Sequence, residues 1–365
     1  MKKLLATLSA TAVMAIPAGG AQAAANPWHT MTFKDQTTGV TLTAVDALSA
    51  TDAWAGGENL DAQPSFDHWN GAGWVPVTGA TVPNVDAAYI DGVKVFASAV
   101  WAVGTWTEDP ASQGSFVEHS TNGKTFTMQK LAAFALYGID GASATNMFAV
   151  GTGTTNAPAT IWHYDGTSWK KSFSVTGARG EFDSVAVVSA SDAWAVGETT
   201  TDAGATVPLS AHWNGSKWTK VKLPGAGNAV FAMLGVAASS ATNVWSAGFA
   251  SADSDICSDC NAIADTLTGG AWTPNNPPSY TTVHELDAVA TTGPSNVWAV
   301  GTRYTAGGDS YNLLDHWNGS AWTSLGGPNA GTYNDLMGIT SVPGQANSFW
   351  AVGPTADGSA ILRCC

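Results

Sequence analysis

The sequence is poor in charged residues, which make up 12% of its 365 residues, and it is poorest in positive ones. Its 14 lysines and arginines stand against 28 acidic residues, giving a formal net charge of −14. Nucleic acids and anionic membrane surfaces attract concentrated positive charge, so this composition argues against both as partners. The 40 glycines instead favour short strands joined by tight turns.

Two further absences concern membranes and catalysis. After the N-terminal segment, no apolar run approaches the roughly 18 residues of a membrane-spanning helix, so we expect no membrane insertion. The sequence also has no G-x-S-x-G, no H-E-x-x-H and no phosphate-binding loop. No catalytic residue can be assigned, and the pattern leans away from an enzyme without deciding the matter.

The N-terminus has the three parts of an export signal. Lys2 and Lys3 precede an apolar stretch from Leu4 to Ile16, and Ala21-Gln22-Ala23 forms a cleavage motif of the A-x-A type. We therefore predict a signal peptide over residues 1–23, a single mature domain over residues 24–365 and a secreted, extracellular protein.

Cysteine is scarce, with four residues in two local pairs. Cys257 and Cys260 form a C-x-x-C, and Cys364 and Cys365 are adjacent. Local disulfides are the expected state in an exported protein. A zinc site made of all four is the alternative, but the repeat described next places the two pairs in different units, so we expect no metal there.

What the sequence has in abundance is an internal repeat. A block similar to Trp-Ala-Val-Gly recurs every 46 to 53 residues, at Trp54, Trp101, Phe148, Trp194, Trp245, Trp298 and Trp350. Each unit holds four strands: an apolar strand A, strand B with the aromatic block, an alternating strand C, and a strand D entered through Asn-Gly or Asp-Gly. Such dipeptides suit the positive backbone angles of hairpin turns. Seven units of this length predict an all-β, seven-bladed β-propeller with four-stranded blades.

The two ends of the repeat complement each other. The seventh unit stops after a strand C over residues 360–365, and residues 28–33 form a spare strand before the first strand A near Leu42. Pairing the first strand with the last ones removes the open edge of a propeller. We therefore predict that the N-terminal strand completes the last blade.

These blocks resemble those of secreted Trp-Ala-Val-Gly-repeat propellers of actinobacterial type. The segment 120–126, Ser-Thr-Asn-Gly-Lys-Thr-Phe, is distantly similar to the Asp-box of other propellers. The resemblance covers the whole mature chain and implies the propeller fold. Propellers of this kind include lectins, assembly factors, lyases and hydrolases, so the resemblance does not choose between functions.

Residues that recur in every unit are explained by the fold. At least 14 of the 17 tryptophans occupy repeat positions, and we expect them to pack between blades. Five histidines share one position in strand C, where a repeated hydrogen bond explains them better than a metal: His68, His119, His163, His212 and His316. His29 and His284 fall outside this pattern.

Loop lengths indicate where a ligand binds. The A–B and C–D turns are short, whereas the B–C loops and D–A connections differ in every unit and share the opposite face, where we expect binding. An exposed Trp106 would offer a flat face to a sugar, with Glu108 and Asp109 as hydroxyl acceptors; alternatively, Trp106 caps its blade. A second candidate ligand-binding cluster lies in the sixth unit: Arg303, Tyr304, Asp309 and Tyr311.

The B–C loops are also acidic, with Glu58, Asp61 and three aspartates in the fifth unit. Those three, Asp253, Asp255 and Asp259, are candidate calcium ligands. Their spacing lacks the glycine turn and the distal Glu of an EF-hand loop. We therefore expect solvated loops and no cofactor, with calcium as the alternative.

Three functions fit this pattern. The first is a binding module, either lectin-like or docked within an extracellular protein assembly through the variable-loop face; a structural platform ranks close behind. The alternative is a polysaccharide lyase or a glycoside hydrolase on a propeller scaffold. A lyase would take its base from His284, Tyr304 or Tyr311. A sialidase would need Arg179, Arg303 and Arg363 together, although the register places Arg363 near the opposite face.

Overall fold

The computed structural model describes residues 26–31, 40–109, 112–154, 157–201, 204–224, 230–252, 259–279 and 282–365, with the side chain of Asp109 excepted. The predicted signal peptide lies outside these residues. Every element within them is a strand. No helix in the described part of the chain is long and apolar enough to span a membrane.

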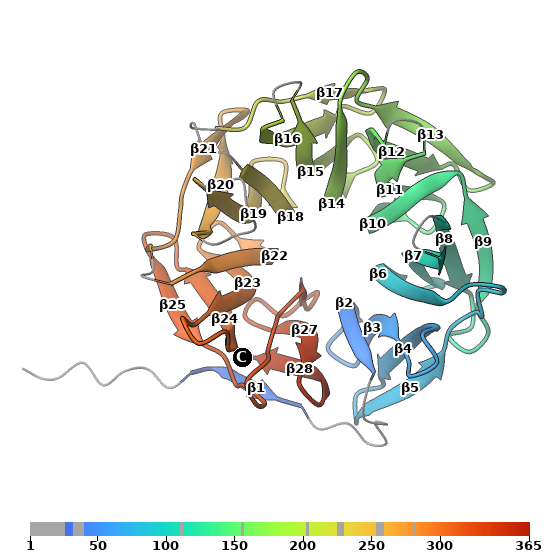
Figure 1. Ribbon diagram of the computed structural model, residues 1–365, viewed down its shortest axis with the longest axis horizontal. Helices are drawn as coiled ribbons and strands as arrows, with labels where there is room; N and C mark the ends of the chain where they lie inside the picture. Colours follow the sequence, from blue (N-terminus) through green and yellow to red (C-terminus); the bar gives the residue numbers. More distant parts are fainter. Residues whose placement is uncertain are drawn as a thin grey trace, which may run out of the picture.

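The strands form seven antiparallel sheets of four, which are arranged as blades around a central opening (Figure 1). Blade 1 contains β2 (Thr41–Ser49), β3 (Asp52–Glu58), β4 (Pro64–Trp69) and β5 (Trp74–Thr78). Blade 2 contains β6 (Ala87–Phe96), β7 (Ala99–Asp109), β8 (Ser112–Ser120) and β9 (Thr127–Leu131). Blade 3 contains β10 (Ala133–Ser143), β11 (Asn146–Gly153), β12 (Ala159–Tyr164) and β13 (Trp169–Ser174).

The remaining four blades repeat this order from the centre outward. Blade 4 contains β14 (Arg179–Ser189), β15 (Asp192–Thr200), β16 (Thr206–Trp213) and β17 (Trp218–Lys220). Blade 5 contains β18 (Val230–Ser240), β19 (Asn243–Ser251), β20 (Asn261–Thr268) and β21 (Ala271–Pro274). Blade 6 contains β22 (His284–Gly293), β23 (Asn296–Tyr304), β24 (Ser310–Trp317) and β25 (Trp322–Gly326). Blade 7 contains β26 (Gly338–Ser341), β27 (Phe349–Thr355), β28 (Gly358–Cys364) and β1 (Trp28–Thr30).

Blade 7 confirms the predicted closure of the ring. Strand β1 pairs with β28, with Trp28 opposite Cys364 and Thr30 opposite Leu362. The strand is shorter than the predicted segment 28–33, and residues 32–33 lie outside the described residues. Because β1 covers the outer side of β28, blade 7 has four strands like the other blades and β28 is not left as an edge strand.

One aromatic contact, repeated seven times, explains why the tryptophans recur. The aromatic residue of strand B in each blade packs against the first aromatic residue of strand D in the next, with ring centroids 5.0 to 6.2 Å apart. Such edge-on pairs are favourable beyond the apolar area they bury. Trp28 of β1 takes the strand D place in blade 7. The pairs are Trp54–Phe126, Trp101–Trp169, Phe148–Trp218, Trp194–Trp272, Trp245–Trp322, Trp298–Trp28 and Trp350–Trp74.

The strand C histidines are structural, as predicted. In four blades Nε2 lies 2.8 to 3.0 Å from a side-chain oxygen at the start of strand B, as in His68–Asp52 and His212–Asp192. The imidazole also stacks on the strand B aromatic ring, 4.3 Å from Trp54 in the case of His68. The Asn-Gly and Asp-Gly turns have positive glycine φ angles, 87° at Gly71 for example, so that prediction is also confirmed.

Candidate functional site

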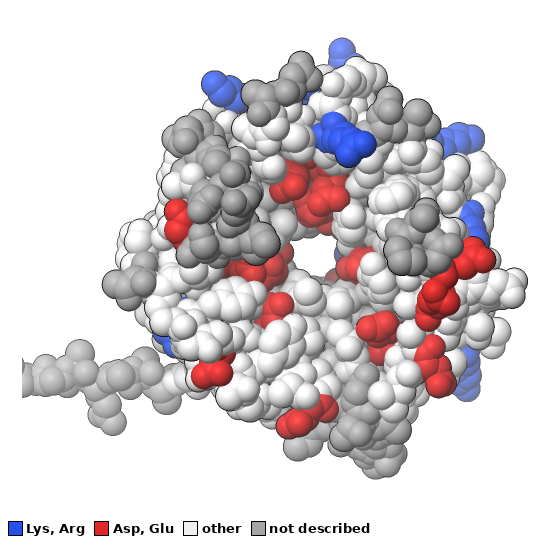
Figure 2. Space-filling model, viewed as in Figure 1, with Lys and Arg blue, Asp and Glu red and all other residues white. Residues whose placement is uncertain are grey.

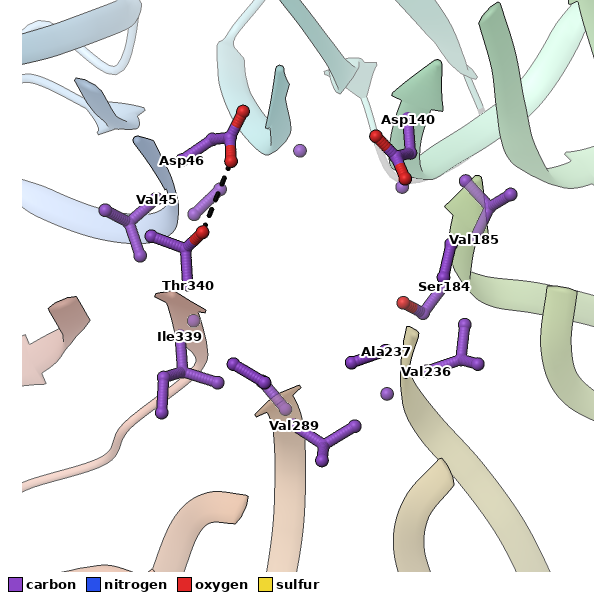
Figure 3. Close-up of a pocket in the computed structure, with 18 of the residues that line it drawn as sticks. Val45, Asp46, Asp140, Ser184, Val185, Val236, Ala237, Val289, Ile339 and Thr340 are labelled. Atoms are coloured by element: carbon purple, nitrogen blue, oxygen red, sulfur yellow. Dashed lines mark hydrogen bonds between the residues drawn. The ribbon is translucent and has the colours of Figure 1, made fainter. Parts of the chain in front are cut away.

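A channel runs through the centre of the ring, enclosed by the innermost strand of every blade. Its volume is about 280 Å³. Figure 3 shows its wall, where Asp46 and Thr340 from neighbouring blades share a hydrogen bond of 3.2 Å. Gly92 and Gly138 allow neighbouring innermost strands to approach closely, because a Cβ at either position would lie 3.2 Å or less from the backbone of the next blade.

The innermost strands of blades 1 to 6 each have a β-bulge whose extra residue lines the channel. In blades 1 to 6 the pairing with strand B skips one residue, and in blade 7 Met337 holds the same place beside Gly338. Bulges re-aim a side chain where pairing is interrupted. We call these seven channel-lining residues the bulge ring: Thr43, Asp91, Tyr137, Asp183, Leu234, Asp287 and Met337.

The three aspartates of the bulge ring each lie among other acidic or phenolic groups. Asp91 of blade 2 is close to Glu58 of blade 1 and Tyr89, and it accepts a 3.1 Å hydrogen bond from Thr105. Its pKa is raised well above the ordinary value, mainly by burial. The first cluster therefore joins blades 1 and 2.

The second cluster lies between blades 3 and 4. Asp183 is close to Glu181 and Glu198 of its own blade, and Glu181 accepts hydrogen bonds from Tyr137 and Thr152 of blade 3. Burial, followed by repulsion from the other two carboxyls, raises the pKa of Asp183 well above its ordinary value. The same two causes raise the pKa of Glu198 to about 7.

The third cluster lies between blades 6 and 7. Asp287 is close to Asp335 and Glu285, and burial and these two carboxyls raise its pKa well above the ordinary value. Asp335 accepts a hydrogen bond from Thr302, and Glu285 accepts one of 3.1 Å from the Tyr304 hydroxyl. Figure 2 shows the outcome: acidic side chains surround the opening, and Lys and Arg lie farther out.

The acidic mouth also has apolar neighbours. Of the five large hydrophobic side chains that are exposed in the described residues, four belong to this face: Leu60, Phe134, Tyr333 and Met337. Leu60 is in a B–C loop, Phe134 and Tyr333 are at or before the start of an innermost strand, and Met337 is in the bulge ring. Acidic and apolar groups are therefore mixed on one face.

Toward the A–B turns, the negative charge of the channel wall is balanced by a lysine of the protein itself. Lys94 lies 2.9 Å from Asp140 and 3.4 Å from Asp46, so one ammonium group joins blades 1, 2 and 3. Burial lowers the pKa of Lys94, but the two carboxylates raise it by more, so the ammonium stays charged. Asp46 and Asp140 also accept backbone N–H groups of the following blade, from Val95 at 2.8 Å and Val187 at 2.6 Å.

The predicted cluster in blade 2 does not present a free aromatic face. Trp106 is half-buried against the blade core, its ring lies over Gly114, and the Lys130 ammonium is 4.0 Å from the ring centroid. This geometry is that of the blade-capping alternative. Glu108 is exposed and accepts a 3.5 Å hydrogen bond from Ser112, and Asp109 ends β7.

Of the predicted cluster in blade 6, Tyr304 contacts an acidic cluster at the channel mouth. Tyr304 joins the third acidic cluster through Glu285. Arg303 is exposed and lies 6.0 Å from the ring of Tyr311, its partner across the hairpin. Asp309 closes the same hairpin loop through its backbone N–H, 3.2 Å from the Thr305 hydroxyl.

The structure describes three of the four cysteines and one of the three candidate calcium ligands. Cys364 and Cys365 form a disulfide, and Cys260 is disulfide-bonded, whereas Cys257, Asp253 and Asp255 lie outside the described residues. Asp259 accepts hydrogen bonds from Ser251 and from the Ala252 N–H. No three His, Cys, Asp or Glu side chains within the described ranges could hold a metal ion together.

The candidate lyase and sialidase residues are not gathered. His284 is fully buried in β22, and its Nδ1 lies 2.7 Å from the Thr282 carbonyl oxygen. The Arg363 guanidinium lies 4.8 Å from the centre of the Trp350 indole, on the face of the propeller opposite the B–C loops. Arg179 is the first residue of β14. The bulge ring was not predicted from the sequence, although every strand A has one variable residue before a small residue and a Val or Ile.

The comparisons with known proteins show the fold. No protein-family model matches the sequence, and no curated protein matches it. Solved propellers match over nearly their whole length. An ulvan lyase of family PL25 bound to a GlcA–Rha3S saccharide has 10% identity and a TM-score of 0.60 over 92% of this chain and 95% of that one.

Two other solved structures are similar over nearly the whole chain. YCF48 bound to D1 peptide has 14% identity and a TM-score of 0.57 over 93% of this chain and 95% of that chain. The WD40 propeller domain of Doa1 has 9% identity and a TM-score of 0.56 over 92% and 96%. At these identities the likeness establishes a seven-bladed propeller of four-stranded blades and leaves the function open.

Proposed function

We propose that this protein is a secreted binding module that holds a protein partner on its loop face, at the mouth of the channel. The observation that carries the proposal is the mixture of acidic and exposed apolar side chains around one opening. Exposed apolar groups within a polar rim are typical of protein–protein contact. A similar propeller, YCF48, was solved with a peptide bound.

Export and family membership belong to the same proposal. Residues 1–23 would direct the chain out of the cell, and the Trp-Ala-Val-Gly blocks would make it one of the secreted actinobacterial-type propellers. The interblade aromatic pairs support the structural role of those blocks. A rigid ring with variable loops suits recognition, because the scaffold holds the loops in fixed positions.

The lyase alternative fits the site less well. The saccharide in the ulvan lyase structure contains GlcA and Rha3S, which are anionic sugars, and the mouth here is acidic. A lyase base must release its proton, but burial and the neighbouring carboxyls raise the pKa of Tyr304, and His284 is inaccessible. The lectin alternative rested on an exposed Trp106, which is covered by Lys130.

The test is selection of peptides from a random display library on the mature protein. The immobilising tag is placed at the C-terminus, which ends at the C–D turn side of blade 7, away from the B–C loops. Binding of the selected peptides is compared between wild type, the double variant Tyr333→Ser/Met337→Ser, and a control, Val75→Ser, which changes an exposed residue on the outer strand β5.

We expect the selected peptides to bind wild type and the control equally, and the double variant about tenfold more weakly, because interface apolar contacts concentrate the binding energy. A glycan array with and without calcium, run on wild type and Trp106→Ala, covers the alternative. Saturable glycan binding together with no selected peptide would replace the protein partner by a glycan.

A further inference from the structure

We infer that the bulge ring binds a basic side chain, lysine or arginine, presented by an extended segment of a protein partner. The inference rests on the proposed function and names the chemistry that its site recognises. It begins from the charge of the mouth. Three bulge-ring residues, Asp91, Asp183 and Asp287, are aspartates, and the charged groups that raise the pKa of each are other carboxyls.

Two carboxylate oxygens in the bulge ring have no hydrogen-bond donor among the described residues. Oδ2 of Asp183 and Oδ2 of Asp287 are buried, and neither accepts a hydrogen bond from a described residue. A buried acceptor without a donor costs free energy, because it has lost its water. An ammonium or guanidinium group offers several N–H donors and positive charge at once, so it satisfies both needs.

Elsewhere in the channel, two aspartates already bind one lysine ammonium group. Three residues farther along the innermost strands, Lys94 of blade 2 lies between Asp46 of blade 1 and Asp140 of blade 3, within 3.4 Å of both. Carboxylates from different blades can therefore converge on one ammonium group. The aspartates of the bulge ring likewise belong to different blades, and among the described residues none of them forms an ion pair with a lysine or arginine.

The size and lining of the channel favour a side chain over a larger ligand. Its volume of about 280 Å³ lies just below the roughly 300–1,000 Å³ of pockets that enclose drug-sized molecules. Leu234 and Met337, the two apolar members of the bulge ring, supply surface for the aliphatic stem of a lysine or arginine. A metal ion is a poorer occupant, since no three acidic side chains in the described residues meet at one point.

The experiment uses two fluorescent octapeptide pools that differ at two fixed central positions, which are lysine in one pool and norleucine in the other. Norleucine keeps the aliphatic stem and removes the ammonium group. Binding is measured by anisotropy to wild type, to Asp183→Asn/Asp287→Asn, and to Asp61→Asn/Asp357→Asn. The last pair removes the same charge from exposed loop residues of the same face, outside the channel lining.

We expect the lysine pool to bind wild type about tenfold or more tightly than the norleucine pool, because close charge pairs carry this much coupling. The preference should disappear in Asp183→Asn/Asp287→Asn and survive in Asp61→Asn/Asp357→Asn, and added salt should weaken it. Circular dichroism and thermal melting confirm that each variant is folded.

Three results would overturn the inference. These are equal binding of the two pools, an unchanged preference in Asp183→Asn/Asp287→Asn, or an equal loss in the loop control, which would indicate a diffuse charge effect. If library-selected peptides still bind wild type in these cases, the protein-binding function stands and only the basic recognition fails. If no peptide binds at all, both proposals fail.

Discussion

The two parts of the channel handle negative charge in opposite ways. Toward the A–B turn side, Asp46 and Asp140 share one internal counter-ion, Lys94, and each also accepts a backbone N–H of the next blade. Toward the loop face, Asp183 and Asp287 are surrounded by further carboxyls. Asp46 and Asp140 connect neighbouring blades through Lys94. Asp183 and Asp287 instead lie among carboxyls that repel them, an arrangement that the fold itself does not require.

This contrast separates scaffold from site within one repeated strand. Both sets of residues occupy the innermost strands and line the same channel, so burial alone does not distinguish them. The presence of internal partners does. Acids that are left without partners at a water-accessible opening are candidates for binding, because perturbed carboxyls gather at functional sites more often than in scaffolds.

The largest effect is expected where the internal pairing is broken. Lys94→Met leaves Asp46 and Asp140 without a counter-charge, so we expect unfolding free energy to fall by about 2–4 kcal/mol, measured by urea denaturation. The control, Lys130→Met, removes an ammonium from the face of Trp106 and should cost about 1 kcal/mol or less. Equal losses in the two variants would show that Lys94 does not hold the blades.

The pH dependence of stability tests the mouth. Burial and Glu181 raise the pKa of Glu198 to about 7, and burial raises the pKa of Glu118, between the blades, to about 8. In the unfolded chain such groups titrate near pH 4. The folded protein therefore retains protons that the unfolded chain has released, and stability should fall as the pH rises from about 4 to 8.

Thermal melting between pH 4.5 and 9 measures this decline. Glu198→Gln should reduce the slope below about pH 7, while Glu118, Asp265 and the bulge-ring aspartates maintain the rest of the decline. Glu108→Gln, an exposed glutamate in a B–C loop, should leave the profile unchanged. A melting temperature that rises steadily from pH 5 to 8 would contradict the assignment of raised pKa values to these carboxyls.

The smallest expected changes in unfolding free energy have opposite signs for one aspartate from each part of the channel. Asp287→Asn removes a charge from an acidic cluster and should stabilise the protein by up to about 1 kcal/mol at pH 8. Asp140→Asn removes a partner of Lys94 and should destabilise it by about 1–2 kcal/mol. Changes of the same sign in urea denaturation would remove the distinction between the two parts of the channel.

The fold was predictable because its determinants are repeated. The aromatic residue of strand B recurs seven times and meets a strand D aromatic of the next blade, so spacing alone gave seven blades. Trp28 revealed the closing strand, since it supplies the strand D aromatic that the seventh unit lacks. The loop face was also anticipated from its variable lengths, and Glu58 of that face does reach the acidic mouth.

The site was not predictable by the same logic. Setting repeated positions aside as scaffold directed attention to the loops and to Trp106, which is covered by Lys130. The bulge ring occupies a repeated position with a non-repeated residue type, from Thr43 to Met337. A recurring pattern, one variable residue before a small residue and a Val or Ile, marks this column in the sequence. Only the register shift between strands A and B shows that the column faces the channel.

The closing of blade 7 by β1 has a mechanical consequence. The first residue of β1, Trp28, lies opposite Cys364, the last residue of β28, so the two ends of the chain leave the sheet side by side. Tension applied to both ends loads the hydrogen bonds between these strands one pair at a time, as in a zipper, and does not shear them together. A molecule tethered at both ends would open first at this seam.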